Sequence, residues 1–433
     1  MRKTTSKMWA AAAGVTGIAL LATACSGSSD TPGDDGDEGG DKNITLTFGT
    51  FNEPGYTDEM FAAYEEANPG ITIQNKKAAT SNEARDNLNT RLASGSGASD
   101  VEMIEIDWLP ELMMYPDKFV DLTDPALDGR WLDWKVAQAT TPDGVLLGYG
   151  TDAGPQAIAF RSDLLAAAGL PSTRDEVAAE LGGADATWDD YFAFGKRYTE
   201  ATGKPFFDAA GAIYQGMINQ VQNAYEEEDG TIIAATNPEV KKIYDAVTTA
   251  SVTDNLSAHL GQWSDDWNAS FQTDGFATML APGWMLGIIE GHSAGVTGWD
   301  IADVFPGGAG NWGGSFLTVP AQSKHQEEAK KFAAWLTAPE QQLTAYKNKG
   351  TFPSQVEALK SDELLSSTNA FFNNAPAGQI LANRAEGIIA PFKGPKYFAV
   401  NDAMQSALTE VDVNGGDPAA QWDTFVGAVN ALG

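Results

Sequence analysis

The stretch FPGGAGNWGGSFLTVP, residues 305–320, sets five glycines around the pair Asn311 and Trp312 and then continues as an apolar, β-branched run. Glycines at this density indicate tight turns and close approach of backbone segments. A Trp on a short polar loop directly before a strand is well placed to contact a flat ligand. The alternative is a glycine-rich surface loop that Trp312 anchors to the core, and the stretch alone leaves both interpretations open.

The composition sets the size of the fold and the kinds of partner that suit it. With 433 residues, 43% of them hydrophobic, the chain can bury a large core, and we expect two domains of about 150–200 residues each. It has 27 Lys and Arg against 59 Asp and Glu, a formal net charge of −32. This acidic excess argues against nucleic acid or an anionic membrane surface as the partner, and it says little about a neutral ligand.

Residues 1–24 have the pattern of a secretory signal peptide. A basic start precedes an apolar segment at 8–21 that is short for a membrane span, and small residues lead into Cys25, the single cysteine of the chain. The segment around Cys25 resembles a bacterial lipobox, with Ala22 at a position that is usually Leu. The resemblance implies that Cys25 becomes the acylated N-terminus of an exported lipoprotein, and the alternative is an ordinary cleaved signal.

Residues 25–42 read as a disordered acidic tether after the lipidated Cys25. The segment 26–42, SGSSDTPGDDGDEGGDK, has many glycines, six acidic residues and almost no apolar side chain, so it cannot bury enough surface to order itself. It lacks the regular Asp spacing and the closing Glu of a calcium-binding loop. We therefore expect a solvated linker and no metal site here.

Strand and helix signals alternate from Ile44 onward. They predict a strand at 44–48, a helix opened by Gly55 and ended at Pro69, a strand at 71–74, a helix at about 81–93 and a strand at 101–106. Strand, helix, strand, helix and strand at this spacing indicate a parallel sheet with crossover helices.

Ligands of such sheets bind outside the carboxyl ends of the strands. In this chain those ends carry Asn52 and Glu53 after one strand, and Asp107 and Trp108 after another. We expect these four side chains to face a ligand crevice.

Later segments continue the α/β pattern. A strand at 157–160 leads into a helix, and a short apolar strand at 276–280 delivers a Pro-Gly turn that places Trp284 at a strand end. Thr187 is a predicted N-cap for a helix with aromatic residues at helical spacing. We expect those aromatics in the core: Trp188, Tyr191, Phe192 and Tyr198.

Several stretches resemble, in order and spacing, the solute-binding lipoproteins of carbohydrate ABC importers, extracellular solute-binding protein family 1. They are FAAYEEANPGI, SGSGASDVEMIEID, AIAFRSDLLAAAGLP, TWDD, FATMLAPGWMLGII and GGSFLTVPAQSKHQEEAKKFAAWLTAPEQQ. The resemblance covers nearly the whole mature chain. The segments GAGNWGGSFL, ATNPEVKKIYD and FFNNAPAGQI are most similar to the actinobacterial branch that takes up cellobiose and related β-linked oligosaccharides.

The resemblance implies a fold of two α/β lobes, each a mostly parallel sheet flanked by helices, that close on ligand like a hinged clamp. Three hinge crossovers would fall near 151–156, 313–317 and 366–375. Lobe one would comprise 44–151 and 316–366, and lobe two 157–312 and 372–433.

A sugar ring presents an apolar C–H face and a rim of hydroxyls, so its site needs aromatic platforms together with carboxylates and amides. The expected platforms are Trp108, Trp284 and Trp312, with Gly313 beside the hinge and Lys393 as a further candidate. Each carboxylate taken singly can equally be a solvated surface group. The expected polar partners are Asn52, Glu53, Asp107, Asp152, Gln156 and Asn311.

The resemblance implies a monomeric binding protein that delivers an oligosaccharide to membrane permease subunits, without a cofactor. The sequence has no Gly-x-Ser-x-Gly elbow, no Gly-Lys-Ser/Thr phosphate loop and no His-Glu-x-x-His motif. His259, His292 and His325 lie far apart in the sequence, so no metal cluster or His-based triad is indicated. The alternatives are a binding protein for a polyol, an amino-sugar or another oligosaccharide, or a secreted glycoside hydrolase with paired carboxylates.

Overall fold

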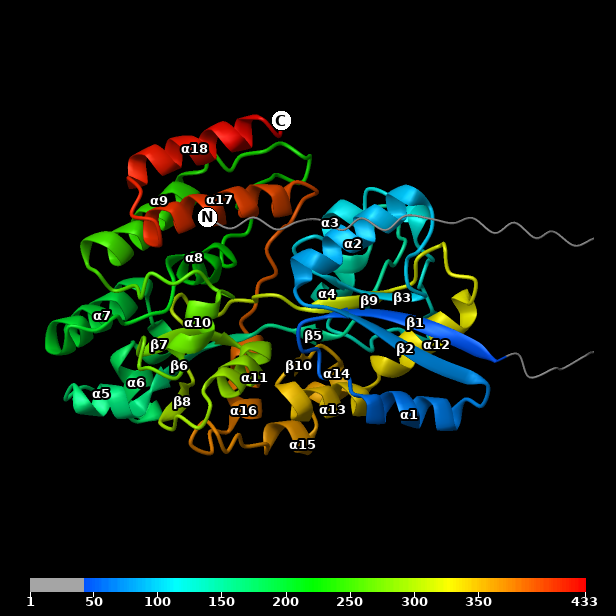
Figure 1. Cartoon of the computed structure of the whole chain (residues 1–433), viewed down its shortest axis with the longest axis horizontal. Coiled ribbons are helices and arrows are strands. Elements are labelled where there is room, and N and C mark those ends of the chain that lie inside the picture. Colours follow the sequence, from blue (N-terminus) through cyan, green and yellow to red (C-terminus); the bar gives the residue numbers. More distant parts are fainter. Residues whose placement is uncertain (1–42) are drawn as a thin grey trace, which may run out of the picture. The chain divides into compact units, whose positions relative to one another are not determined.

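Two main β-sheets organise residues 43–433, the part of the chain that the computed structural model describes (Figure 1). The predicted signal peptide, the lipidated Cys25 and the tether at 25–42 lie outside the described residues. No helix within 43–433 is long and apolar enough to cross a lipid bilayer.

The first sheet has the strand order β2-β1-β3-β9-β4. Strand β1 pairs in parallel with β2 and β3, while β9 is antiparallel to both β3 and β4. Helix α1 contacts β2, and α2 contacts β1 and β3, which confirms the predicted alternation of strands and crossover helices (Figure 1). The bounds are β1 Ile44–Phe51, α1 Asp58–Ala67, β2 Ile71–Ala78, α2 Ser81–Ser94, β3 Val101–Glu105, β4 Tyr149–Gly150 and β9 Ser315–Thr318.

The second sheet has the order β7-β6-β8, and its central strand is antiparallel to both neighbours. The expectation of a mostly parallel sheet is therefore wrong for this part of the chain. Strand β6 follows β4 and β5 directly. The chain then forms several helices before it returns to the sheet as β7, which runs antiparallel to β6. The bounds are β5 Asp152–Ala153, β6 Gln156–Arg161, β7 Thr278–Pro282 and β8 Trp299–Ala302.

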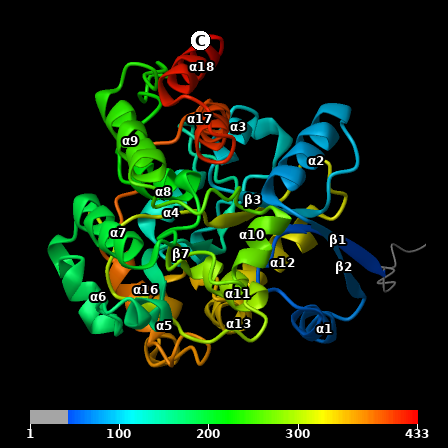
Figure 2. The same ribbon diagram turned by 60° about the vertical axis from the view of Figure 1, so that its left-hand side comes forward.

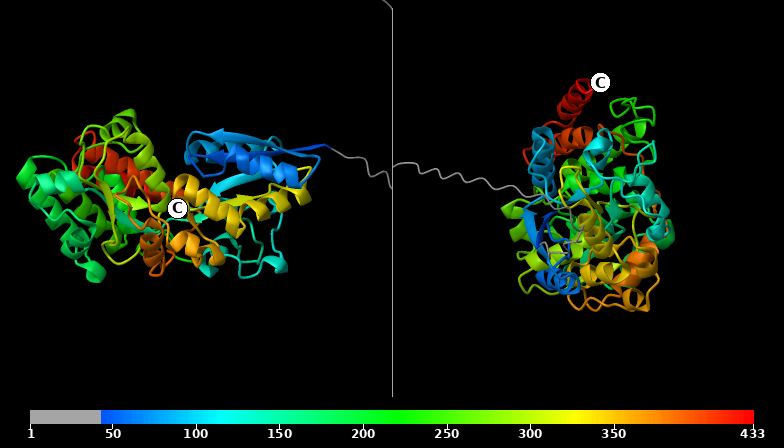
Figure 3. Two further views of the ribbon diagram at one scale, coloured as in Figure 1. Left: turned by 90° about the horizontal axis from the view of Figure 1, so that it is seen from below. Right: turned by 90° about the vertical axis from the view of Figure 1, so that its right-hand side faces the viewer.

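The chain passes from the first sheet to the second between β4 and β6, and returns between β8 and β9. Seen from below, the blue and cyan elements of the first sheet and the green elements around the second form separate groups (left view of Figure 3). The two groups have separate hydrophobic clusters, so each sheet has its own core.

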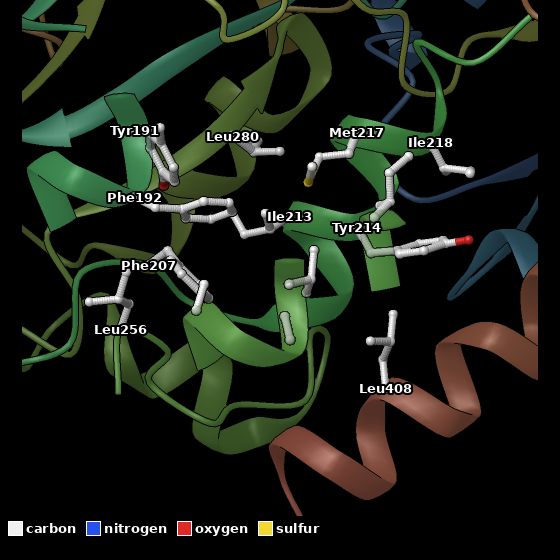
Figure 4. Close-up of a cluster of buried hydrophobic side chains, with 14 of the residues drawn as sticks. Tyr191, Phe192, Phe207, Ile213, Tyr214, Met217, Ile218, Leu256, Leu280 and Leu408 are labelled. Carbon is white, nitrogen blue, oxygen red and sulfur yellow. The ribbon is translucent and has the colours of Figure 1, made fainter. Parts of the chain in front are cut away.

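The helices beside the second sheet build a core of large aromatic and aliphatic side chains (Figure 4). Tyr191, Phe192 and Tyr198 of α7 (Trp188–Thr202) are buried as predicted, while Trp188 is only partly buried and packs against the same cluster. Thr187 caps α7 in a capping box with Asp190. Burying such side chains stabilises the fold by about 1.5–3 kcal/mol each.

Helix α8 (Ala210–Ile218) is buried between α9 and α17 (Tyr397–Asp412), and α18 packs on α17 (Figure 2). A third cluster joins β10 (Phe352–Pro353) and α13 to α11, so residues of the segment 343–364 contact elements beside the second sheet. The lobe limits themselves stay a prediction. The other helices are α3 Leu109–Leu112, α4 Asp133–Ala139, α5 Ser162–Ala167, α6 Arg174–Glu180, α9 Pro238–Thr248, α10 Asp265–Ser270, α11 Gly283–His292, α12 Gln326–Leu336, α13 Pro339–Lys349, α14 Val356–Leu359, α15 Asp362–Leu365, α16 Ala377–Ala385 and α18 Pro418–Asn430.

Candidate functional site

A cavity of about 630 Å³ lies at the carboxyl ends of β1 and β3 and faces elements that belong to the second sheet. The carboxyl-end position is where the sequence pattern predicts a ligand crevice. Its walls come from the turns after β1 and β3, the passages between the sheets, the loop before α10, and helices α8, α11 and α17. The lining includes Asn52, Glu53, Glu105, Asp107, Asp152, Gln215, Gln262, Trp263, Trp284, Trp312, Gly313, Phe398, Asn401, Asp402 and Gln405.

Three tryptophans form one wall of this cavity. The Trp284 and Trp312 rings meet edge to face, with centroids 5.7 Å apart and planes at 88°. Trp263 stacks on Trp284 at 6.1 Å and 25°. The wall therefore combines the stacked indoles of Trp263 and Trp284 with the Trp312 indole, which is nearly perpendicular to Trp284. Indole faces in two orientations are available to an apolar ligand surface.

Trp284 reaches the wall because β7 ends at Pro282 and α11 begins at Gly283. Its indole Nε1 donates a hydrogen bond to the backbone oxygen of Trp312 at 2.8 Å, so the two rings hold each other in place. The sequence predicts both rings as platforms, and the structure places both in the cavity wall; that they bind a ligand stays a prediction.

Trp312 is positioned by contact between the two passages that join the sheets. Its backbone N–H donates to the Gly154 oxygen at 2.8 Å, and a Cβ on Gly154 would lie 1.8 Å from the Trp312 oxygen. Only glycine allows the two backbones to approach this closely. Gly313, which lines the cavity, has φ of +77° and continues the turn.

The structure places Asn311 in the passage between the sheets and not in the cavity wall. Its side chain is 3% exposed, accepts a hydrogen bond from the Gly154 N–H at 2.8 Å and donates to the Gly313 oxygen at 2.9 Å. Asn311 does not line the cavity and instead ties the passages together. Both ends of its amide are already used, so it has no free group to offer a ligand.

Trp108 and Gln156 also lie outside the cavity lining. Trp108 is 1% exposed in the first core, and its Nε1 donates to the Ser81 hydroxyl at 2.9 Å. Gln156 is fully buried in β6. Neither lines the cavity: the Trp108 indole turns back to Ser81 at the start of α2, and Gln156 lies at the start of β6 beside Pro282 of β7, with its side chain near Gly310.

The predicted polar residues Asn52, Glu53, Asp107 and Asp152 do line the cavity. Burial alone would raise the pKa of Glu53, but a hydrogen bond and charge attraction from Lys77 lower it, and Lys349 adds to this at 3.3 Å. Glu53 is therefore a charged group at the rim.

Asp152 sits deeper, next to the passage between the sheets. It is 7% exposed, and burial raises its pKa. One carboxylate oxygen accepts hydrogen bonds from the Thr151 hydroxyl at 2.7 Å and the Ser315 N–H at 2.9 Å. These bonds join the turn after β4 to the start of β9, so Asp152 holds the passage and borders the cavity at once.

Asp107 forms an ion pair with Lys393, whose side chain is 4% exposed. Burial alone would lower the pKa of Lys393, but Asp107 raises it, with smaller effects from Tyr397 and Glu105. Lys393 follows Phe392, whose N–H donates to the Gln222 oxygen beside the second sheet. The ion pair therefore bridges the turn after β3 and the elements of the second sheet.

Glu105 and Trp263 line the cavity and Lys135 lies behind the lining, and sequence reasoning missed all three. Burial raises the pKa of Glu105 well above its usual range, and the neighbouring Asp107 raises it further. Lys135 is 1% exposed with its ammonium 3.8 Å from the Phe316 ring centre, and burial lowers its pKa to about 8. The signal that could have found Glu105 is its position at the carboxyl end of β3, the same edge that carries Asp107.

Trp263 has φ of +72° and remains 45% exposed. A bulky residue in the left-handed region is strained, and such strain concentrates at functional sites. In the sequence, Trp263 stands just before the N-cap Ser264, where it looks like an ordinary helix boundary. Its place in the cavity wall follows only from the fold.

The loop that precedes Trp263 is anchored by the buried carboxylate of Asp412. It accepts hydrogen bonds from the Ser251 hydroxyl at 2.5 Å and the Ser257 hydroxyl at 3.0 Å, and lies 2.9 Å from His259 Nδ1. The hydrogen bond to Asp412 raises the pKa of His259. No group of three or more His, Cys, Asp or Glu side chains within 43–433 is arranged to hold a metal ion.

Comparison with known proteins identifies the fold and family. The family model for bacterial extracellular solute-binding proteins matches residues 59–373. An arabinooligosaccharide-binding protein of Bacillus subtilis (strain 168) is 26% identical over 315 residues, which cover 68% of this chain and 70% of the relative.

Among solved structures, one described as an extracellular solute-binding protein family 1 member has 45% identity and a TM-score of 0.80, covering 90% of this chain and 99% of its own. A binding protein of B. animalis subsp. lactis Bl-04 in complex with beta-1,6-galactobiose has 20% identity and a TM-score of 0.76, covering 90% and 96%. The predicted α/β fold with two lobes is confirmed by these structures. The chain belongs to the bacterial extracellular solute-binding protein family.

Proposed function

We propose that this protein is the sugar-binding subunit of an ABC importer. In this proposal it is exported, anchored to the outer face of the cell membrane through Cys25, and delivers a captured oligosaccharide to membrane permease subunits. The observation that carries the proposal is the cavity wall of Trp263, Trp284 and Trp312 opposite the carboxylates that follow β1 and β3. The names of the relatives, which refer to arabinooligosaccharide and galactobiose, support a sugar ligand.

The cavity suits the chemistry of a sugar. An indole face covers the apolar C–H face of a pyranose ring, and carboxylate oxygens accept hydrogen bonds from the hydroxyls on its rim. The cavity of about 630 Å³ falls within the range of roughly 300–1,000 Å³ for small-molecule sites. A short oligosaccharide lying across the tryptophans would contact Asp107 and Glu53 from its edge.

Capture would proceed by closure of the two lobes without covalent chemistry. A ligand shifts an open–closed equilibrium only through contacts that are better in the closed form, so both lobes must contribute groups. Contacts already cross the cavity here: Lys393 pairs with Asp107, and the Arg85 guanidinium lies 4.0 Å from the Phe398 ring centre. A bound sugar would add its own bridge between the same walls.

The finer proposal is a β-linked, cellobiose-like ligand, which rests on the similarity of GAGNWGGSFL and FFNNAPAGQI to the cellobiose branch. An equatorial β-linkage gives a nearly flat chain that suits the indole wall. The competing proposal is another oligosaccharide, such as one containing arabinose or galactose, as the names of the relatives suggest.

The test is calorimetric titration of a chain that begins at Ser26 with cello-, xylo-, arabino-, galacto-, malto- and manno-oligosaccharides. We expect binding to one series, weakened at least about tenfold in Trp312→Ala, because aromatic hot-spot residues commonly contribute about 2 kcal/mol or more and about 1.4 kcal/mol is tenfold in affinity. Trp422→Ala is the matched control, since Trp422 lies outside the cavity and packs on Tyr244 at 5.2 Å. No binding to any series by the folded protein would contradict the proposal, and shorter sugars appearing during incubation would indicate a hydrolase.

A further inference from the structure

All charged side chains that line the cavity carry the same sign. They are the carboxylates of Glu53, Glu105, Asp107, Asp152 and Asp402, which we call the acidic lining. No Lys, Arg or His within 43–433 is part of the wall. A ligand in the cavity therefore faces hydrogen-bond acceptors of negative charge and no fixed cation.

The cations that balance this charge lie behind the acidic lining. Lys77 and Lys349 reach Glu53 from outside the wall, and Lys393 pairs with Asp107 while only 4% exposed. Lys135 is 1% exposed, and its ammonium lies over the Phe316 ring with no hydrogen-bond partner among the described residues. Lys77 and Lys349 stabilise the half-exposed carboxylate of Glu53, Lys393 stabilises that of Asp107, and none of the four lysines is part of the cavity lining.

This arrangement distinguishes ligands by charge. A sugar hydroxyl donates well to a carboxylate, and a hydrogen bond with one charged partner is stronger than a neutral one. A carboxylate on the sugar would meet like charges at short range in a partly desolvated site, where repulsion is much stronger than in water. Burial raises the pKa of Glu105 well above its usual range and also raises that of Asp152, whereas Lys77 and Lys349 lower that of Glu53, which stays charged at the rim.

We propose that the acidic lining makes this a binding protein for uncharged sugars that rejects sugars carrying a carboxylate, such as uronic acids. The proposal rests on the proposed sugar-binding function and narrows it to a substrate class. The net charge of −32 acts in the same direction, because it lowers the encounter rate with anions.

The test uses three matched ligands built on the oligosaccharide that binds best in the calorimetric panel. They are the neutral sugar, its counterpart that ends in the corresponding uronic acid (a hexose oxidised to a carboxylate at C6, or a hexuronic acid in place of a terminal pentose), and the methyl ester of that carboxylate. At neutral pH and low salt we expect the uronate to bind at least about 100-fold more weakly than the neutral sugar, and the ester to bind within about tenfold of it.

The outcomes are distinguishable. Uronate binding as tight as that of the neutral sugar would overturn the charge selection and leave the proposed function intact. An ester as weak as the uronate would show that size, and not charge, causes the rejection. Absence of binding by every neutral sugar would instead contradict the proposed function.

Asp402→Asn tests the acidic lining at one exposed position whose replacement does not endanger the fold. We expect the preference for the neutral sugar over the uronate to fall by about threefold to tenfold, because one like charge is removed at the wall. Asp423→Asn on α18 is the matched control, since it makes the same change in net charge away from the cavity. Equal effects of both substitutions would overturn the local explanation.

Discussion

Replacing Trp263 separates the contribution of its indole to binding from the strain of its backbone. The side chain is 45% exposed, and a Trp side chain presents up to about 250 Å², so roughly 110 Å² of indole is open for a ligand to cover. At about 25 cal/mol per Å² this area corresponds to at most about 2.8 kcal/mol. Binding recovers only part of such a value, so we expect a loss near 1.4 kcal/mol, or about tenfold in affinity.

Stability should respond differently to Ala and to Gly at this position. With φ of +72°, an Ala keeps the left-handed strain of about 1–2 kcal/mol, whereas Gly is free of it. The free energy of unfolding of Trp263→Gly should therefore exceed that of Trp263→Ala by about 1 kcal/mol, so the Gly variant unfolds at a higher urea concentration. Both variants should lose affinity to a similar extent.

The assays are calorimetric titration with the sugar that the wild type binds and urea unfolding followed by circular dichroism. Unchanged affinity in both variants would refute the assignment of Trp263 to the binding wall. An Ala variant that is as stable as the Gly variant, or more so, would refute the reasoning from backbone strain.

Three further tests, each by urea unfolding, address contacts around the cavity. Lys393→Met should lower the free energy of unfolding by about 3 kcal/mol because it leaves Asp107 unpaired, and adding Asp107→Asn should recover part of this loss. If the effects of the two substitutions simply add, the ion pair does not contribute as argued. The Asp412 carboxylate raises the pKa of His259, so the stabilisation that protonated His259 gives is fully present below its unfolded pKa of 6.5 and disappears as pH rises through the raised folded pKa. His259→Gln should therefore destabilise the protein at about pH 5.5 and have little effect at about pH 9. Equal effects at both pH values would contradict this argument. Gly154→Ala should lower the free energy of unfolding by about 1–3 kcal/mol, since the added Cβ would lie 1.8 Å from a backbone oxygen. Gly291→Ala in α11, where the added Cβ meets open space, should be neutral or slightly stabilising. Similar results for both substitutions would refute the close-approach argument.

Much of the first sheet and part of the cavity wall could be predicted because the signals are local. Alternating apolar residues from Ile44, the turn at Pro69 and the Thr80 cap of α2 fix strand and helix identity within a few residues. Trp284 follows a strand end, and Trp312 stands between glycine turns, so short stretches alone placed both near the crevice. The order of several such stretches also indicated the family, which the family model confirms.

The tertiary structure decided which neighbouring side chains face the cavity. Trp108 and Asp107 are adjacent in sequence, yet Trp108 turns into the core toward Ser81 while Asp107 meets Lys393, 286 positions away. The sequence determines where a turn begins, because that depends on local propensity and patterning. The direction of each side chain in the turn, and the charge that faces a ligand, depend on a few backbone dihedrals and on packing partners distant in the chain, so they appear only when the fold brings those partners together.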